Sequence, residues 1–262
     1  MGVITPTNKE VLDYKDLHLF HAGASNCSMR VRMTLEEKQL PWTSHHLNIL
    51  KKEHITPEYF GINPNGLVPT LVHDGTVIIE SDDIIDYLDE TFPNPPLKSY
   101  KDKDKEATYT WLHRATSIHL EAVKPYIYAK RIGKSMAHSS EEDEKYRQLQ
   151  TNPDLLEFHR KSTQEGFSDD ETSRAEGVLD KCFADMEQLL EKQEWLAGQQ
   201  FSLADIAWVP LYFTLDKLAG YSFDKYPQVS SWTQRIGERD SYQQGVLNWW
   251  PVELGGVWQQ DA

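Results

Sequence analysis

The sequence predicts a mixed α/β domain followed by an all-α domain. In residues 17–92, apolar runs of strand length alternate with helical periodicity in the order β-α-β-α-β-β-α, which is typical of a mixed sheet. The adjacent prolines Pro95 and Pro96 then interrupt the periodicity and predict a stiff linker. From Lys101 onward the strand pattern disappears and apolar residues recur at helical spacing. We expect an α/β domain at 15–93, a linker at 94–101, a helical domain at 102–250 and a C-terminal tail at 251–262.

The predicted elements of the first domain are, in order, a strand at Leu17–Phe20, a helix at Met29–Lys38, a strand at His45–Ile49, a helical turn at Pro57–Phe60, strands at Thr70–His73 and Thr76–Ile79, and a helix containing Ile84, Ile85 and Leu88. Asp74-Gly75 suits a two-residue hairpin turn. Pro69 stands just before a strand, where a proline removes one backbone donor. The backbone of Val68 is then free to pair with a molecule outside the sheet, and a small peptide would fit.

The second domain is predicted to contain at least three helices. Apolar spacing indicates a helix at Thr108–Arg131, in which Pro125 predicts a kink or a break. Thr172–Gln193 is amphipathic, and the more apolar Leu203–Ala219 is expected at the centre of the domain. Ser202-Leu203-Ala204-Asp205 is typical of a capping box at a helix start. The polar and acidic residues 133–173 predict a solvated helix surface with a loop.

Composition restricts the possible functions. The chain has 262 residues, of which 26% are charged and 39% apolar, as in folded soluble proteins. A net charge of −14 argues against a nucleic-acid partner, because phosphates require a basic surface. No apolar run approaches the roughly 20 residues that span a bilayer, so no membrane partner is expected. Cys27 and Cys182 lie far apart, which fits a reducing cytoplasm better than a disulfide framework.

The pattern Val68-Pro69 … Glu80-Ser81, followed by Ser202-x-x-Asp205, resembles the glutathione transferase superfamily across residues 17–240. The resemblance implies a thioredoxin-like N-terminal domain with a cis peptide bond at Pro69 and an all-helical second domain. It also implies a transferase that takes glutathione, acts on a hydrophobic small-molecule electrophile and forms a homodimer.

The same resemblance implies a glutathione site. The Val68 backbone at Pro69 would pair with the cysteinyl unit, and Glu80 and Ser81 would hold the γ-glutamyl end. Ser81 begins a helix, and a helix N-terminus offers unpaired amides to a carboxylate. The alternative is that Ser81 only caps its helix. Lys51, Lys52 and His54 follow the second strand, where a cation for the glycyl carboxylate is expected, and we take Lys52 and His54 as the candidates.

The loop before the first helix reads His21-Ala-Gly-Ala-Ser-Asn-Cys-Ser-Met-Arg-Val-Arg32, and it should carry the residue that activates the thiol. Ser25 matches the first serine of the zeta-class motif Ser-Ser-Cys-Ser-x-Arg-Val-Arg; its hydroxyl would stabilise the glutathione thiolate. Cys27 matches the cysteine of the Ser-x-Cys-Ser-Met motif of bacterial reductive dehalogenases; it would react through a glutathione mixed disulfide. Asn26 and Ser28 are further possible donors, and the choice stays open.

A second resemblance concerns the acceptor. The stretch from Asn152 to Phe167 is similar to an insertion of bacterial glutathione transferases that act on aromatic substrates, including enzymes that cleave β-aryl ethers of lignin. Cys27 departs from the β-etherase pattern. The pocket would lie between the domains beside Tyr109, Trp111, His119, Tyr126 and Tyr128, although aromatic residues at helical spacing are more often core. No spacing typical of metal ligands is present.

These observations favour an enzyme that transfers the glutathione thiolate to an electrophilic, aromatic small molecule, with β-aryl ether cleavage as one such reaction. The first alternative is a Cys27-dependent thiol-transferase or reductive dehalogenase. The second is a module that binds glutathione without turnover.

Overall fold

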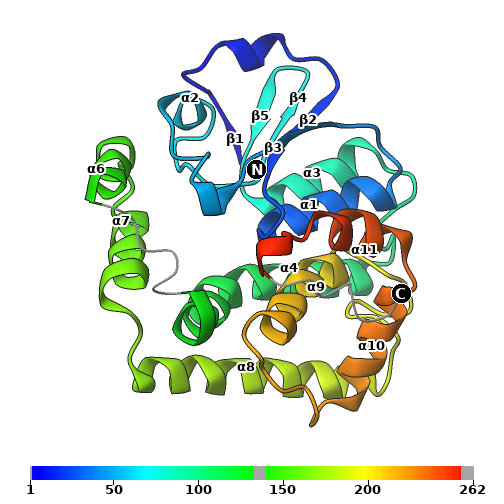
Figure 1. The fold of residues 1–262 in the computed structure, drawn as a ribbon. Helices are drawn as coiled ribbons and strands as arrows, with labels where there is room; N and C mark the ends of the chain where they lie inside the picture. The colour runs from blue at the N-terminus through cyan, green and yellow to red at the C-terminus, as the bar shows by residue number, and fades with distance from the viewer. Residues whose placement is uncertain (1, 133–139, 255–262) are drawn as a thin grey trace.

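The computed structural model describes residues 2–132 and 140–254, which form a sheet domain and a helical domain (Figure 1). The sheet has the strand order β1-β5-β4-β2-β3, and only β2 and β3 run parallel. The strands are β1 (Val3–Ile4), β2 (Leu17–His21), β3 (Thr43–His46), β4 (Thr70–His73) and β5 (Thr76–Ile78). The helices α1 (Asn26–Glu37) and α3 (Ser81–Thr91) lie between the sheet and the helical domain, and α2 (Pro57–Phe60) lies apart from them (Figure 1). The mixed sheet and the helical second domain confirm the predicted fold class.

Local capping explains where the first domain differs from the predicted bounds. Helix α1 begins at Asn26 rather than Met29, because the Ser25 side chain accepts a hydrogen bond from the Ser28 amide. The second strand ends at His46 rather than Ile49. Asn48 stops it, because its side chain accepts from two backbone amides and starts a 3₁₀ turn instead. The sheet also includes β1, which precedes the expected domain start at residue 15.

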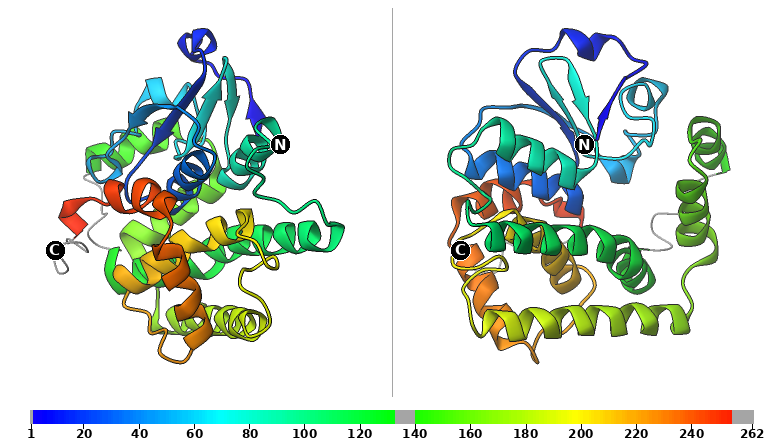
Figure 2. Two further views of the ribbon diagram at one scale, coloured as in Figure 1. Left: turned by 90° about the vertical axis from the view of Figure 1, so that its right-hand side faces the viewer. Right: turned by 180° about the vertical axis from the view of Figure 1, so that it is seen from behind.

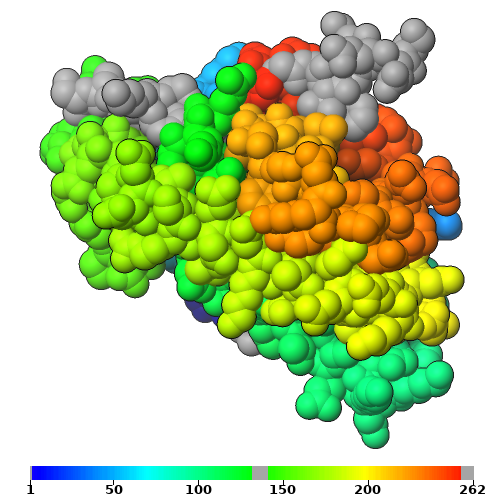
Figure 3. Space-filling model, turned by 90° about the horizontal axis from the view of Figure 1, so that it is seen from below, coloured from blue at the N-terminus to red at the C-terminus, as the bar shows by residue number. Residues whose placement is uncertain are grey.

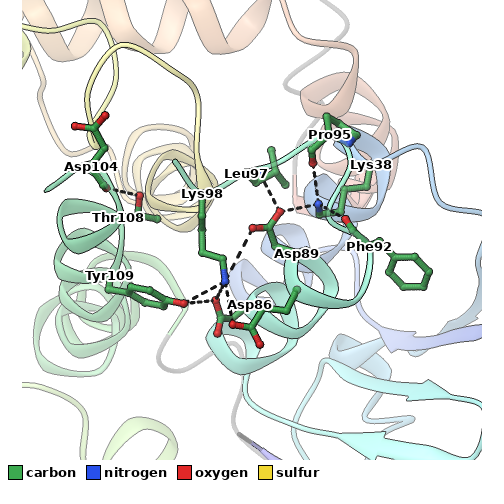
Figure 4. A network of polar contacts seen from close by, with 11 residues as sticks. Lys38, Asp86, Asp89, Phe92, Pro95, Leu97, Lys98, Asp104, Thr108 and Tyr109 are labelled. Carbon is green, nitrogen blue, oxygen red and sulfur yellow. Dashed lines mark hydrogen bonds and ion pairs between the residues drawn. The ribbon is translucent and has the colours of Figure 1, made fainter. Parts of the chain in front are cut away.

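The linker is fixed to both domains by two lysines (Figure 4). Lys38, at the end of α1, forms an ion pair with Asp89 at 2.6 Å, and its Nζ donates to the carbonyl oxygens of Phe92 (2.8 Å) and Pro95 (2.9 Å). Lys98 binds Asp86 of α3 and the hydroxyl of Tyr109 in the helical domain. These contacts join the first domain, the linker and the helical domain.

The first long helix of the second domain contains two wide turns. Helix α4 (Asp102–Ile118) continues into a π-helical turn (His119–Val123), α5 (Lys124–Ile127) and a second π-helical turn (Tyr128–Ile132). The predicted interruption at Pro125 is confirmed. A proline cannot donate to the preceding turn and its ring crowds the carbonyl of residue i−4, and the wider π-helical turn accommodates both effects.

The remaining helices include α9, which is buried along most of its length. They are α6 (Ser140–Leu149), α7 (Pro153–Arg160), α8 (Asp169–Leu190), α9 (Leu203–Lys217), α10 (Pro227–Gly237) and α11 (Asp240–Gly245). The capping box at Ser202 and Asp205 is present as predicted. Seen from below, α8 and α10 cover the face away from the sheet (Figure 3). No helix among the described residues is both long and apolar enough to cross a membrane.

Helices α6 and α7 form a column beside the molecule, and we call the segment 140–165 the arm (Figure 2). The arm contacts the first domain in three places. Tyr146 packs against Phe60 of α2, with ring centroids 6.5 Å apart. Glu142 forms an ion pair with Lys52 at 2.6 Å, and Gln150 Nε2 donates to a backbone carbonyl of the loop after α2 at 2.9 Å. The arm therefore joins the domains a second time, away from the linker.

Candidate active site

The structure brings together the expected thiol-activating serine and the expected peptide-binding backbone. Ser25 stands at the N-cap of α1, and its Oγ lies 3.5 Å from the carbonyl oxygen of Val68. The Val68–Pro69 peptide bond is cis, as the resemblance implied. Two segments 43 residues apart in the sequence thus meet at the N-terminus of α1.

The loop that carries Val68 is held from behind. Asn63 Nδ2 donates to the Leu67 carbonyl oxygen at 2.8 Å and to Thr70 Oγ1 at 3.0 Å. The Tyr59 hydroxyl donates to the same Leu67 carbonyl at 2.6 Å. Among the described residues, the Val68 amide makes no hydrogen bond. The loop thus presents a fixed backbone donor and acceptor that an extended peptide could pair with.

The loop that carries Ser25 is held by the C-terminal part of the chain. Arg32 is fully buried, and it donates to the carbonyl oxygens of Ala22 (2.9 Å), Gly23 (3.2 Å) and Gly245 (2.7 Å). A Cβ atom at Gly23 would lie 2.1 Å from the carbonyl oxygen of Trp249, so only glycine fits there. Trp249 therefore packs directly against this loop.

Cys27 faces a histidine of the helical domain. Its Sγ lies 3.7 Å from Nδ1 of His119, which is buried. Burial lowers the pKa of His119 well below its usual value, and the nearby charges of Lys124 and Arg30 lower it further. The imidazole is therefore neutral at neutral pH, and its Nδ1 lies within hydrogen-bonding distance of the thiol sulfur.

The two other candidates in this loop serve the fold. Ser28 is fully buried, and its Oγ accepts a hydrogen bond from the Ala22 amide at 3.2 Å. Asn26 is buried as well, and its Nδ2 donates to Thr214 Oγ1 in α9 at 3.0 Å. Ser25 and Cys27 are only half-buried, so they are the two side chains of this loop best placed to meet a ligand.

Glu80 and Ser81 form the start of α3. Glu80 has a φ of 65°, which is uncommon for a residue other than glycine. Burial raises the pKa of its carboxyl group, and the carboxylates of Asp82 and Asp83 raise it further. Ser81 is the first residue of the helix, and its Oγ accepts a hydrogen bond from Arg30 Nη1 at 3.2 Å. The unpaired amides at this helix start suit a carboxylate, as the sequence suggested.

The expected cation for the glycyl end is already engaged. Lys52 is 15% exposed and forms its ion pair with Glu142 of the arm. His54 is half-buried two residues further along the same loop. The role of both side chains in binding the glycyl carboxylate stays a prediction.

Sequence reasoning missed Lys124. Its Nζ lies 5.1 Å from the ring centroid of Phe158 in α7, and burial lowers its pKa, with the charges of Cys27 and Glu80 opposing. His119 and Lys124 are five positions apart, which places them on one face of a π-helical turn but about 140° apart on an α-helix. Lys124 directly precedes Pro125, so the sequence indicates its position facing His119 only if Pro125 is taken to predict a π-helical turn.

The aromatic residues expected to line the pocket divide between the core and the contact with the arm. Trp111 packs against Trp208 at 5.6 Å and Tyr126 against Tyr221 at 5.7 Å, and all four are buried. Tyr128 instead contacts Phe158 of the arm at 5.5 Å. Across residues 2–132 and 140–254, no group of three or more His, Cys, Asp or Glu side chains could hold a metal ion.

Two family models match the chain. The glutathione S-transferase N-terminal domain matches residues 19–96, and the glutathione S-transferase C-terminal domain matches residues 153–240. Together they cover more than half of the sequence. The first match lies on the sheet domain and the linker, and the second lies on the helical domain.

Individual relatives agree with this match. Glutathione S-transferase hmp2 of Hypomyces subiculosus is 28% identical, covering 84% of this chain and 93% of the relative. Protein LigF of Sphingobium sp. is 28% identical over 85% of this chain and 90% of LigF. The solved structure of β-etherase LigF from Sphingobium sp. strain SYK-6 covers 87% of this chain and 98% of its own, with a TM-score of 0.79 and 25% identity. A glutathione-bound theta-class transferase from Xanthomonas axonopodis pv. citri shares the fold at a TM-score of 0.69 and 19% identity, covering 89% of this chain and 98% of its own.

Proposed function

This chain belongs to the glutathione S-transferase family, whose members are glutathione-dependent transferases, and we propose that it transfers the glutathione thiolate to a small aromatic electrophile. One observation carries the proposal. The Ser25 hydroxyl stands at the N-terminus of α1, 3.5 Å from the carbonyl oxygen of Val68, whose backbone would orient the cysteinyl unit. A sulfur atom bound there would lie within reach of Ser25.

Bound glutathione would supply the nucleophilic sulfur. Ser25 would stabilise the negative charge on this sulfur by donating a hydrogen bond to it. The hydroxyl is available for this, because in the free chain its hydrogen bond to the Val68 carbonyl oxygen is weak at 3.5 Å. The positive N-terminal end of α1 adds to this stabilisation. Arg32 and Trp249 fix the loop before Ser25, so the donor is oriented in advance. At the other end of the peptide, Glu80 and Ser81 would hold the γ-glutamyl group.

Two observations support an aromatic acceptor. Tyr128 and Phe167 both contact Phe158 of the arm, with ring centroids 5.5 and 6.5 Å apart, so aromatic rings gather beside the end of the first long helix. The relative LigF, described as a β-etherase in its solved structure, matches this chain over most of both sequences. We therefore propose β-aryl ethers as the first acceptor class to test. Cys27 argues against this class, because a cysteine at this position departs from the β-etherase pattern of the loop before α1.

The contact between Cys27 and His119 favours a second candidate function. Cys27 lies in the first turn of α1, whose positive N-terminal end would stabilise a thiolate that exchanges with a disulfide, and His119 Nδ1 lies 3.7 Å from its sulfur. The chain would then act as a glutathione-dependent thiol-transferase or reductive dehalogenase.

Two variants separate the candidates when turnover with glutathione is measured against an aryl ether, an aryl halide and a disulfide. If Ser25 stabilises the thiolate, we expect Ser25→Ala to lower turnover of the aryl substrates by about 10²–10³-fold, the effect of losing one preorganised donor. Cys27→Ala should then have a mild effect. The opposite ranking, or a glutathione adduct on Cys27 in the intact mass spectrum, would favour the second candidate.

We also propose a homodimer in the reducing cytoplasm. The family supports the dimer, and the two cysteines, which are free thiols in the structure, support the location.

A further inference from the structure

Lys124 is a cation of the helical domain that has no counter-ion in the fold. It follows the π-helical turn His119–Val123 and is half-buried. It takes part in no ion pair among the described residues, whereas the equally half-buried Lys52 and Lys98 each bind a carboxylate. Its Nζ instead lies 5.1 Å from the ring centroid of Phe158 in α7. An ammonium group held only by an aromatic ring keeps its three N–H donors for a ligand.

The electrostatic partners of Lys124 place it beside the proposed site. Burial lowers its pKa, and the negative charges of Cys27 and Glu80 oppose this. These two residues stand at the starts of α1 and α3, on either side of the place proposed for glutathione. In addition, His119 Nδ1 lies 3.7 Å from Cys27 Sγ, and Lys124 shares one face of the π-helical turn with His119. The ammonium group therefore lies near the place where the glutathione sulfur would react beside Ser25.

Of the side chains around this place, Lys124 is best suited to give up a proton. His119 is already neutral, because burial lowers its pKa. Arg30, the other cation that acts on His119, stays protonated because it is a guanidinium. Burial raises the pKa of Tyr128, which makes its phenol a weaker acid. A lysine is different, because its pKa falls from 10.5 on burial toward the value near 10 of a phenol, so a proton passes easily between the two.

The surroundings of Lys124 also suit an aromatic group. Phe158 contacts the Lys124 ammonium group on one side and the ring of Tyr128, at a centroid distance of 5.5 Å. An aryl ether carries its ring directly on the oxygen that leaves. Its ring could therefore lie against these aromatic side chains while its oxygen meets the ammonium group.

We propose that Lys124 is the general acid that protonates the leaving oxygen when this chain cleaves an aryl ether. The glutathione thiolate attacks the carbon that bears the aryl oxygen, so a C–S bond forms and the C–O bond breaks. The electron pair of the broken bond goes to the oxygen, which takes a proton from the Lys124 ammonium group and leaves as a phenol. The amine then regains its proton from water. The proposal rests on the proposed function, because it takes glutathione as the thiolate and an aryl ether as the acceptor.

The test compares two ethers that differ only in the leaving group. Turnover with glutathione is measured for phenacyl phenyl ether and for phenacyl para-nitrophenyl ether. The nitrophenolate is a stable anion that leaves without a proton, whereas the phenolate is basic and gains most from a general acid. We expect Lys124→Met to lower the ratio of phenyl ether to nitrophenyl ether turnover by about tenfold or more.

Lys130→Met is the matched control. Lys130 lies in the next π-helical turn, is exposed, and has its Nζ 5.6 Å from the ring centroid of Tyr126. The control thus removes the same charge and a similar cation–π contact from the same stretch of helix, and it should leave both turnovers unchanged. If Lys124→Met lowered both turnovers equally, Lys124 would support the thiolate or the fold instead of the leaving oxygen, and the proposal would be overturned. An equal change of the ratio in both variants would overturn it as well.

The unmodified chain gives a second test that requires no variant to fold. Turnover is measured for a series of phenacyl aryl ethers whose phenols have increasing pKa. With a general acid, we expect turnover to fall much less along the series than the uncatalysed reaction with glutathione does. An equally steep fall would contradict the role of Lys124. If the unmodified chain cleaved none of these ethers, the proposed acceptor class itself would be refuted.

Discussion

At the scale of single residues, His21 shows how burial fixes a protonation state. Arg32 Nη1 lies 3.2 Å from His21 Nδ1, and since arginine only donates, Nδ1 must accept. The proton of the neutral ring then sits on Nε2, which donates to Ser44 Oγ at 2.8 Å. Burial, followed by the charge of Arg32, lowers the pKa of His21 to about 2. The ring of His21 is therefore neutral in the folded protein at neutral pH.

This residue should make stability depend on pH. In the unfolded chain His21 regains a pKa near 6.5 and takes up a proton below it, whereas the folded chain takes none until about pH 2. The free energy of unfolding should therefore fall as the pH drops below about 6.5, by about 1.4 kcal/mol per pH unit for this residue alone. Urea unfolding between about pH 7 and 5 measures the slope.

His21→Gln is the comparison, because all other titrating groups are common to both proteins. One of these, Asp205, acts in the opposite direction, since burial raises its pKa to about 6. The difference between the two slopes isolates His21. Equal slopes would show that the histidine titrates alike in both states.

At the scale of elements, the start of α9 shows which part of a capping box carries stability. Ser202 Oγ accepts a hydrogen bond from the Ala204 amide at 3.2 Å. The Asp205 carboxylate accepts from the Ser202 amide, the Ser202 hydroxyl and the Leu196 amide, each at 3.0 Å, and from the Trp232 indole at 2.9 Å. The aspartate therefore joins the helix start to two other segments, whereas the serine acts locally.

We expect the two substitutions to differ in cost. Ser202→Ala should lower the free energy of unfolding by about 1 kcal/mol, the usual value of an N-cap. Asp205→Ala should cost at least about 3 kcal/mol, because it removes the acceptor of four buried donors. Urea denaturation of both variants measures the difference. Equal costs would mean that the links to Leu196 and Trp232 contribute nothing.

At the scale of the whole molecule, the arm connects the domains through a small separate cluster. Ile55, Phe60 and Tyr146 form this cluster, apart from the main core that α1, α3, α4 and α9 share. The ion pair between Lys52 and Glu142 adds little, since partly exposed pairs are worth under about 1 kcal/mol. Tyr146 is thus the main attachment of the arm to the first domain.

Removing that attachment should release the arm without unfolding the core. In Tyr146→Ala we expect faster amide hydrogen exchange in α6, α7 and α2, and unchanged exchange in α9, because local opening follows local packing. Hydrogen-exchange mass spectrometry measures both regions in one experiment. Lys145→Ala, an exposed neighbour on the same helix, is the control and should leave exchange in all these segments as it is. Faster exchange in α9 as well would show that the arm belongs to the main cooperative unit.

The sequence by itself determined the features that depend on neighbouring residues. The hairpin at Asp74-Gly75, the helix start at Ser81 and the capping box at Ser202 were predicted correctly, because turns and caps are decided within about four positions. The order of these signals, together with the proline-rich linker, was enough to predict both domains, and the family resemblance implied the cis peptide bond at Pro69. Two predicted bounds were wrong. The side chain of Ser25 starts α1, and that of Asn48 ends the second strand, about three residues earlier than expected, because each caps the backbone.

Only the tertiary structure decided which side chains meet. Cys27 and His119 are 92 residues apart, and Arg30 and Ala207 are 177 apart. Lys52, expected to be a free cation beside the ligand, is paired with an arm residue 90 positions away. Such contacts depend on how α1 packs against α4 and α9 and on where the π-helical turn places His119. Packing of this kind is a property of shape and burial across the whole chain, so no local pattern in the sequence could reveal it.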